Sequence, residues 1–345
     1  MRTGIFHESH RSEEQLWDSP TARRWMAEFM VALVALPLYG SDYMLAMACI
    51  VGIHIVATLG LNVTTGSTGQ ISLAHAAFLG VGCYTVAWLA KHGVPFYVAL
   101  PLAGLVAAAL GVVVGLPSLR VKGLYLAIAT LAAHFILTFV FREWDAVTGG
   151  VPGTSIPRAK LFGFELIGDR RNFYLIYGCV LLLALATRNL QRSYIGRAFI
   201  AVRDRDISAE ILGVNLLHTK LLAFALGAFY AGVAGGLLGY FYGNITPEYF
   251  TFTLSIFYLA AIIVGGATVL GGILGAVFMT FVPELLRLAA HASAQWMPGI
   301  AGLLLPMGQV VFGLLIIGFL IFEPLGLSAI WARVRRVFHL WPFVT

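Results

Sequence analysis

Four long stretches of this 345-residue chain contain no Asp, Glu, Lys or Arg, and this feature constrains the fold more than any other. Each stretch exceeds the roughly 20 apolar residues that cross a bilayer. The charged fraction of the whole chain is 11%, whereas soluble domains carry roughly 25%. Most of the chain is therefore expected to lie in lipid. The uncharged stretches are 43–90, 221–247, 249–283 and 288–322.

Hydropathy and the positions of Gly and Pro predict an all-α polytopic membrane protein with about ten transmembrane helices. Helices are expected because every backbone N–H and C=O in lipid must be paired within the chain, and the sequence lacks the alternation of a transmembrane barrel. The predicted spans are 25–40, 43–63, 71–90, 95–115, 123–141, 172–187, 221–242, 251–268, 271–287 and 306–322.

The spans divide the chain into a cytoplasmic lead-in over 1–24, a transmembrane domain over 25–323 and a cytoplasmic tail over 324–345. The lead-in has no apolar core and so does not read as a cleaved signal peptide. Two connections are too long for turns. We expect 143–171 to be an external loop and 188–220 to be a cytoplasmic loop.

The distribution of basic residues sets the predicted orientation. With both termini inside, the cytoplasmic connections hold fifteen Lys and Arg residues and the external ones hold seven. This asymmetry favours the proposed orientation over its inverse. A net charge of +6 concentrated in such short segments indicates membrane orientation and no nucleic-acid partner. The cysteines Cys49, Cys83 and Cys179 lie in apolar runs without paired spacing, so neither a disulfide nor a metal site is expected.

The segment 69–84 places three polar side chains, Gln70, Ser72 and His75, in one uncharged membrane stretch. Polar groups there are costly unless they face a cavity or a partner helix. One interpretation is the lining of a translocation path that offers hydrogen bonds without fixed charge. The other is contact between helices, and the spacing of the residues favours neither.

Glycines interrupt two apolar segments in corresponding positions of the two halves. Gly80 and Gly82 permit close backbone approach in the first segment, and the run 265–275 predicts a turn or a broken helix in the second. A tight helical hairpin is the alternative for the second. Such a pair allows an inverted repeat with broken or re-entrant segments.

The basic connection 188–220 predicts one or two short amphipathic helices. Apolar positions such as Ile207 and Ile211 alternate there with both signs of charge. The element around Glu210, followed by Gly213, suits a short helix that ends at a glycine. Such a helix can bind lipid headgroups, but mixed charge favours a protein groove.

Motifs of catalysis and of ion coupling are missing from the sequence. It contains no G-x-x-x-x-G-K-[ST] phosphate loop, no G-x-S-x-G and no H-E-x-x-H, so we expect no enzyme and no catalytic residue. Glu284 is the only carboxylate deep in a late span, and Arg287 on the same helical face predicts an intrahelical ion pair. An ion-driven secondary transporter or a channel, the rival class, would need more intramembrane charge.

Five strings of the sequence resemble the M-type inner-membrane permease subunit of branched-chain amino acid ABC importers. They occur in the family's order and cover nearly all of the membrane domain. One small departure is Ala74-His75, where the family pattern has Gly-His. The strings are GQISLAHAAFLGVGCY (69–84), LRVKGLYLAIATLA (119–132), TGGVPGTSIP (148–157), GRAFIAVRDRDISAEILGVNLLHTKLLAFALGAFYAGVAGGL (196–237) and GGATVLGGILGA (265–276).

The resemblance implies a bacterial inner-membrane complex that moves solute by alternating access. Its partners would be an H-type permease, two cytoplasmic ATPase subunits that bind ATP and magnesium, and a periplasmic solute-binding protein. This chain itself would hold no cofactor. The family's cytoplasmic loop docks on an ATPase subunit, although the order Ser-Ala-Glu here departs from the importer pattern E-A-A followed by Gly. The implied coupling residues are Arg197, Arg203, Ala209, Glu210, Gly213 and Asn215.

The resemblance implies branched-chain or related amino acids as the transported solutes. Permeases for urea or aromatic acids share the same architecture, so the resemblance leaves these solutes open as alternatives.

Overall fold

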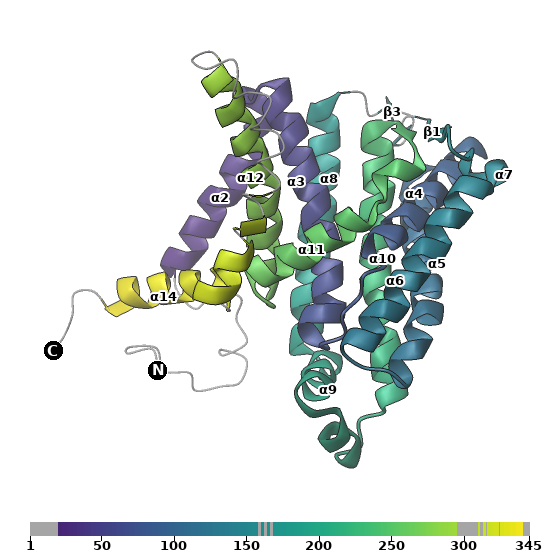
Figure 1. Ribbon diagram of the computed structural model, residues 1–345. Helices are drawn as coiled ribbons and strands as arrows, with labels where there is room; N and C mark the ends of the chain where they lie inside the picture. Colours follow the sequence, from purple (N-terminus) through teal and green to yellow (C-terminus); the bar gives the residue numbers. More distant parts are fainter. Residues whose placement is uncertain are drawn as a thin grey trace.

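The computed structural model describes residues 20–157, 160–161, 164–165, 168–294, 310, 313–314, 316–323 and 325–340, which form a bundle of helices with a few very short strands (Figure 1). In chain order the elements are α2 (Pro20–Tyr39), α3 (Asp42–Leu61), η1 (Asn62–Ser67), α4 (His75–Lys91), α5 (Phe96–Gly115), η2 (Leu116–Leu119), α6 (Leu124–Glu143), α7 (Asp145–Thr148), β1 (Thr154–Ser155), β2 (Lys160–Leu161), β3 (Phe164–Glu165), α8 (Asp169–Arg192), α9 (Tyr194–Ile211), α10 (Leu216–Tyr242), β4 (Asn244–Ile245), η3 (Pro247–Tyr249), α11 (Phe252–Gly265), α12 (Val269–Ala294) and α14 (Leu327–Leu340).

The predicted spans coincide with helices. Among the described residues, seven helices are long and apolar enough to cross a membrane, or eight if the bent pair 316–322 and 327–334 forms one span. The apolar part of α2, Met30–Tyr39, is shorter. The last predicted span, 306–322, falls only partly on described residues, and these are helical. An all-α polytopic membrane protein is therefore confirmed.

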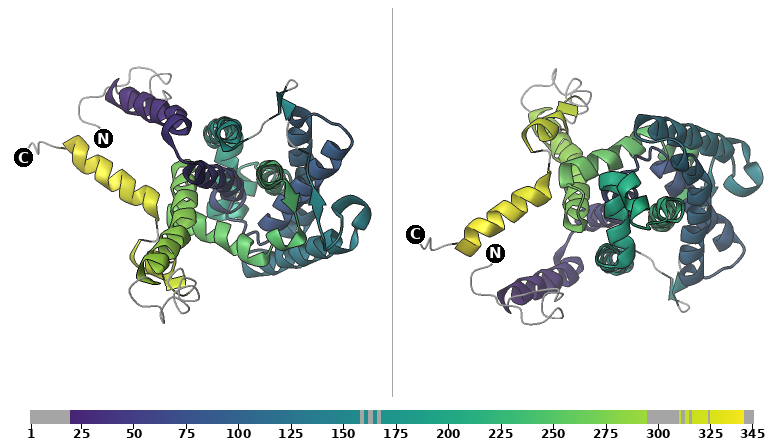
Figure 2. Two further views of the ribbon diagram at one scale, coloured as in Figure 1. Left: turned by 90° about the horizontal axis from the view of Figure 1, so that it is seen from above. Right: turned by 90° about the horizontal axis from the view of Figure 1, so that it is seen from below.

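α10 lies inside the bundle and packs against α5, α4 and α3, as the views along the helices show (Figure 2). Glycines bring these helices together. A Cβ on Gly82 would lie 2.1 Å from the carbonyl oxygen of Gly232, and one on Gly235 would lie 1.9 Å from that of Leu79. The predicted close approach at Gly82 is confirmed. At Gly80 the neighbour is instead an aromatic ring of α6.

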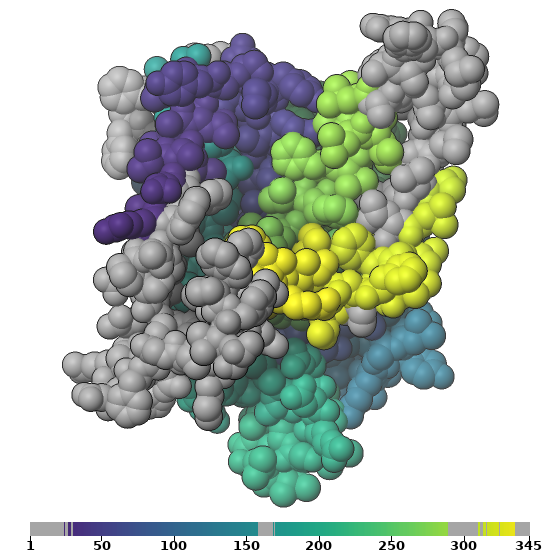
Figure 3. All heavy atoms as spheres, turned by 90° about the vertical axis from the view of Figure 1, so that its left-hand side faces the viewer, coloured from purple at the N-terminus to yellow at the C-terminus, as the bar shows by residue number. Residues whose placement is uncertain are grey.

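The two long connections lie at opposite ends of the bundle (Figure 1). α9 projects from one end, and Figure 3 shows it in teal beneath the rest of the molecule. At the other end β1 pairs antiparallel with β4, with Thr154 opposite Ile245. This pairing joins the 143–171 connection to the segment that follows α10.

The glycine-rich run 265–275 forms a turn between two helices, which is the hairpin alternative. α11 ends at Gly265, Gly266 has a φ of +97° that favours glycine, and α12 begins three residues later at Val269. A Cβ on Gly265 would lie 2.0 Å from the carbonyl oxygen of Gly271, so the two helices touch at the turn. α11 has 14 residues, a length of about 21 Å, which is less than the ~30 Å hydrocarbon core.

At both ends of the chain, helices extend into segments that were predicted as a lead-in and a tail. α2 begins at Pro20, so the end of the predicted lead-in is already helical, and residues 1–19 lie outside the described part. The predicted tail contains the helix α14. Residues 341–345 are also outside the described part.

Candidate translocation and coupling site

The chain leaves α-helical geometry between α3 and α4. η1 is a π-helix, a form often found at functional sites, and residues 68–74 after it are not helical. Side chains of two other helices accept hydrogen bonds from backbone N–H groups in and next to this non-helical stretch. Thr130 Oγ1 accepts a hydrogen bond from Leu73 N, and Ser255 Oγ accepts one from Ala76 N, each at 2.9 Å. We call residues 68–74 the re-entry segment. Its irregular backbone is stable because protein surrounds it.

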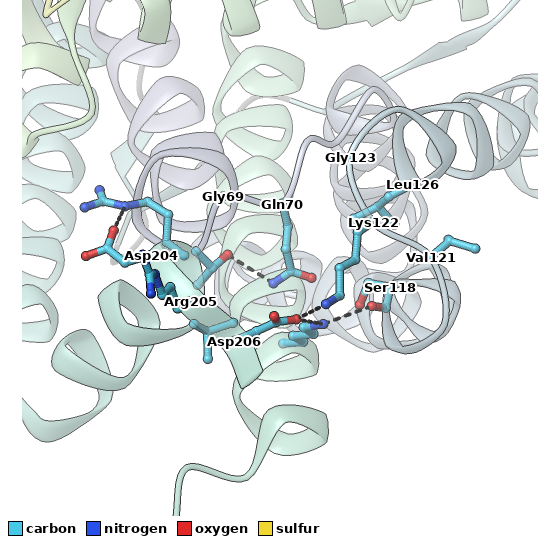
Figure 4. A pocket seen from close by; sticks show the side chains of 14 residues that line it. Gly69, Gln70, Ser118, Val121, Lys122, Gly123, Leu126, Asp204, Arg205 and Asp206 are labelled. Carbon is cyan, nitrogen blue, oxygen red and sulfur yellow. Dashed lines mark hydrogen bonds and ion pairs between the residues drawn. The ribbon is translucent and has the colours of Figure 1, made fainter. Parts of the chain in front are cut away.

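Gln70 lies in the re-entry segment with its carboxamide fixed by a short hydrogen-bond chain. The Thr68 hydroxyl donates to the Thr64 carbonyl oxygen at 2.5 Å, so its oxygen accepts from Gln70 Nε2 at 3.0 Å. This leaves Gln70 Oε1, which has no hydrogen-bond partner among the described residues. The side chain is 5% exposed and lines a pocket (Figure 4).

Ser72 and His75 lie inside the bundle, away from that pocket. His75 Nε2 donates a hydrogen bond to the Ala57 carbonyl oxygen of α3 at 2.8 Å, and its ring meets the ring of Tyr258. Ser72 is 2% exposed, and its hydroxyl has no partner among the described residues. The three polar residues therefore share one segment of chain but not one surface. Their assignment to the path stays a prediction.

The connection 188–220, predicted to be cytoplasmic, folds into a helix with a hinge. α9 starts at an N-cap, Ser193, whose hydroxyl accepts from Gly196 N, and its helical geometry is interrupted at Arg205. The second half ends in a Schellman motif, because Val214 N donates to Ala209 O and Gly213 N donates to Glu210 O. One or two short helices ended by a glycine were predicted, and the kinked helix α9, followed by Gly213, agrees with this prediction.

We call residues 206–215 the α9 tip. Its surface is apolar and acidic, since Ile207, Ile211 and Leu212 are exposed beside Glu210. Ala209 is buried beneath them. The tip continues to Asn215, whose side chain caps α10. Several large apolar side chains exposed together are typical of a surface that a partner protein covers.

Four of the six implied coupling residues meet at this tip, and two do not. Ala209, Glu210, Gly213 and Asn215 lie within it. Arg197 donates to the Arg192 carbonyl oxygen near the start of α9. Arg203, before the hinge, donates to the Gly66 carbonyl oxygen of η1 at 3.1 Å and pairs with Asp204.

A pocket of about 180 Å³ lies between the re-entry segment, the connection from η2 to α6, α9 and the start of α10 (Figure 4). Its lining carries four basic and two acidic side chains together with Gln70. This volume is below the roughly 300 Å³ of drug-sized sites and suits water or a small solute. The lining residues are Thr68, Gly69, Gln70, Ser118, Val121, Lys122, Gly123, Leu126, Val202, Arg203, Asp204, Arg205, Asp206 and Lys220.

Three of these residues form an ion cluster. Lys122 Nζ pairs with Asp206 Oδ2, and Lys220 Nζ lies 3.6 Å from the same oxygen. Lys220, which is 5% exposed, also donates to the Ser118 carbonyl oxygen at 3.4 Å. The hydrogen bond from Lys122 is the main cause that lowers the pKa of Asp206, against the opposing effect of burial.

Sequence reasoning missed this cluster. The count of basic residues placed both lysines on the same side of the membrane as Asp206. That shared side was the one sign in the sequence that these three residues could meet. Pairing between three separate elements depends on tertiary structure, which periodicity does not reveal. Elsewhere in the described part of the chain, no group of three or more His, Cys, Asp or Glu side chains is placed to hold a metal ion.

A re-entry segment inside a helical membrane bundle and an exposed tip after a hinge are the parts expected of a permease. A family model described as the permease component of the branched-chain amino acid transport system matches residues 43–320. The chain belongs to this permease family. No solved structure gives a significant match.

Three relatives agree with this membership. The permease is 36% identical over 289 residues to the high-affinity branched-chain amino acid transport permease LivM of Salmonella typhimurium, covering 76% of this chain and 68% of the relative. It is 35% identical to LivM of Escherichia coli over the same shares. It is 28% identical over 297 residues to a probable LivH permease of Methanocaldococcus jannaschii, covering 82% and 91%.

Proposed function

We propose that this permease is the membrane-spanning subunit of an ABC importer that carries branched-chain amino acids across a bacterial inner membrane. The observation that carries the proposal is the similarity to LivM over three quarters of the chain. Relatives named LivH are less similar, which favours the M-type role.

The driving energy comes from other subunits in this proposal. The sequence contains no phosphate loop, so ATP and magnesium bind to two cytoplasmic ATPase subunits, and this chain catalyses no reaction. The α9 tip docks in a cleft of one of them. Support comes from its exposed Ile207, Ile211 and Leu212, which would otherwise face water.

The remaining partners follow from the same assignment. An H-type permease completes the membrane heterodimer, and a periplasmic binding protein supplies solute at the end that carries β1 and β4. Similarity to relatives of both names supports a pair of related permeases. Lipid surrounds the bundle, both termini face the cytoplasm, and no nucleic acid takes part.

Solute passes by alternating access, because two states of the permease pair are favoured in turn by the ATPase subunits. Gln70, Ser72 and His75 would contact a zwitterion at separate points of the path, and none of the three adds a carboxylate, ammonium or guanidinium group that would hold it tightly. Strong binding is left to the external receptor.

Reconstitution tests the proposal. The full complex in proteoliposomes with ATP at the ATPase side should take up labelled leucine, and unlabelled isoleucine or valine should compete where urea and aromatic acids do not. Competition by urea or an aromatic acid alone would assign another solute. Uptake by this chain alone on an ion gradient would contradict the ABC importer and favour a secondary transporter or channel.

Docking of the tip has its own test. The substitution Glu210→Arg should leave membrane insertion intact and abolish solute-stimulated ATP hydrolysis by the complex, whereas Glu210→Asp should retain it. The side chain is exposed, so the bundle should tolerate both changes. Unchanged stimulation in Glu210→Arg would remove the docking role.

A further inference from the structure

The hinge of α9 separates two anchors. Before it, Arg203 donates to the Gly66 carbonyl oxygen of η1. Directly after it, Asp206 pairs with Lys122, which precedes α6, and lies close to Lys220 of α10. The first half of α9 is therefore bonded to η1, and the tip is bonded to the start of α10 and to the residue two positions before α6.

Asp206 is the centre of the second anchor. Both ammonium groups approach the same oxygen, Oδ2, while Oδ1 accepts from Ile207 N at the start of the tip. The carboxylate thus binds both lysines and also the backbone N–H of the next residue in the tip. Its side chain is 18% exposed, so solvent screens these contacts less than it would at a free surface.

Lys220 makes this anchor hard to replace. Its ammonium is almost fully buried, and its contacts to Asp206 and to the Ser118 carbonyl oxygen are both long, at 3.6 and 3.4 Å. Without the carboxylate, the buried charge would have no acidic partner among the described residues that line this pocket.

We propose that Asp206 is a positioning residue that holds the α9 tip against the start of α6 and of α10. A displacement of the tip is then transmitted to both helices at once. Gln70 lies beside the cluster in the same pocket, so displacement of Lys122 would also change the surroundings of a residue predicted to line the path (Figure 4). This inference rests on the proposed docking function of the tip.

The test measures coupling in the assembled transporter. Solute uptake and ATP hydrolysis are recorded in the same proteoliposomes, and their ratio is the readout. Asp206→Asn should lower uptake per ATP about tenfold, within the 5- to 150-fold range of typical coupling between sites. The matched control is Asp204→Asn, the same change two residues earlier on an exposed side chain that pairs with Arg203, and it should retain the ratio.

Rescue separates positioning from simple loss of structure. Asp206→Glu keeps the carboxylate that both lysines contact and should retain most of the wild-type uptake per ATP. Should Asp206→Asn fail to assemble, Lys122→Gln serves instead, because its side chain is 62% exposed and the bundle should tolerate it. It should lower the ratio, whereas Lys122→Arg should not.

The inference is overturned if assembled Asp206→Asn or Lys122→Gln keeps the wild-type ratio, if Asp204→Asn lowers it equally, or if Asp206→Glu lowers it as much as Asp206→Asn does. A wild-type complex without ATP-dependent uptake would instead refute the proposed function. The two failures are therefore distinguishable.

Discussion

At the scale of single residues, the absence of side chains is as important as their presence. Gly235 of α10 faces the backbone of α4, and even a methyl group would lie 1.9 Å from the Leu79 carbonyl oxygen. A backbone atom cannot rotate away as a side chain can. The distance between α4 and α10 is thus set by this one residue and by Gly82 nearby.

The first prediction follows from this contact. Gly235→Ala should destabilise the permease by about 1–3 kcal/mol through overpacking. Gly178→Ala is the control, since this helical glycine of α8 has nothing within 4 Å of the new Cβ. Thermal unfolding in detergent would compare the variants, and equal melting temperatures would contradict the packing argument.

The second prediction concerns pH. Lys122 lowers the pKa of Asp206, so the folded-state pKa lies below the ordinary value of about 3.9. The stabilising contribution of this carboxylate is then present above that value and is lost as pH falls through the folded pKa.

The melting temperature of the wild-type complex should accordingly exceed that of Asp206→Asn by a constant amount between pH 7 and 5, and the difference should shrink only below about pH 4. Thermal unfolding of both proteins across this range provides the measurement. A difference that already vanished on acidification from pH 7 to 5 would be inconsistent with the lowered pKa.

At the scale of elements, α9 is built to present its tip in one direction. Gly213 has a φ of +91° and ends the helix, while nothing lies within 4 Å of a Cβ placed on it. The cost of a side chain there is purely conformational. Left-handed geometry costs an ordinary residue about 1–2 kcal/mol.

Gly213→Ala should therefore fray the tip and reduce solute-stimulated ATP hydrolysis several-fold while the bundle stays folded. Gly93→Ala is a close match, because Gly93 has a φ of +79° and equally open surroundings but lies after α4, at the end of the bundle opposite α9. Solute-stimulated ATP hydrolysis should fall in Gly213→Ala and stay at the wild-type rate in Gly93→Ala. Similar losses in both would point to general destabilisation.

Elements also show where sequence reasoning succeeds. Long uncharged runs predicted the spans, because length and apolarity suffice to identify a transmembrane helix. The start of α4 was placed at residue 71, whereas it lies at His75, because Thr130 and Ser255 from distant helices satisfy the intervening backbone. The hinge at Arg205 has neither Gly nor Pro to announce it.

The candidate site was less predictable than the fold. The glycine-ended tip was foreseen, since Gly213 follows a short amphipathic segment and its role is local. The partners of His75, Arg203 and Asp206 all lie in other elements, so no pattern along the chain indicates them.

At the scale of the whole molecule, orientation is the open prediction. The positive-inside count places the α9 tip in the cytoplasm and the loop that holds Val151 outside. Single cysteines in a cysteine-free background test this. Ile207→Cys, at a site 68% exposed, should react with an impermeant maleimide only from the cytoplasmic side, and Val151→Cys, at a site 65% exposed, only from outside. Reversed labelling would invert the topology.

α10 is one uninterrupted helix that extends from one of these faces to the other. It runs for 27 residues, about 40 Å, from its cap at Asn215 in the tip to Gly243 next to β4. Because one continuous helix spans this distance, a displacement of its end at one membrane face would also displace its end at the other face. In the proposed importer, the binding protein at the outer face and the ATPase subunits at the inner face would thus act on opposite ends of the same helix.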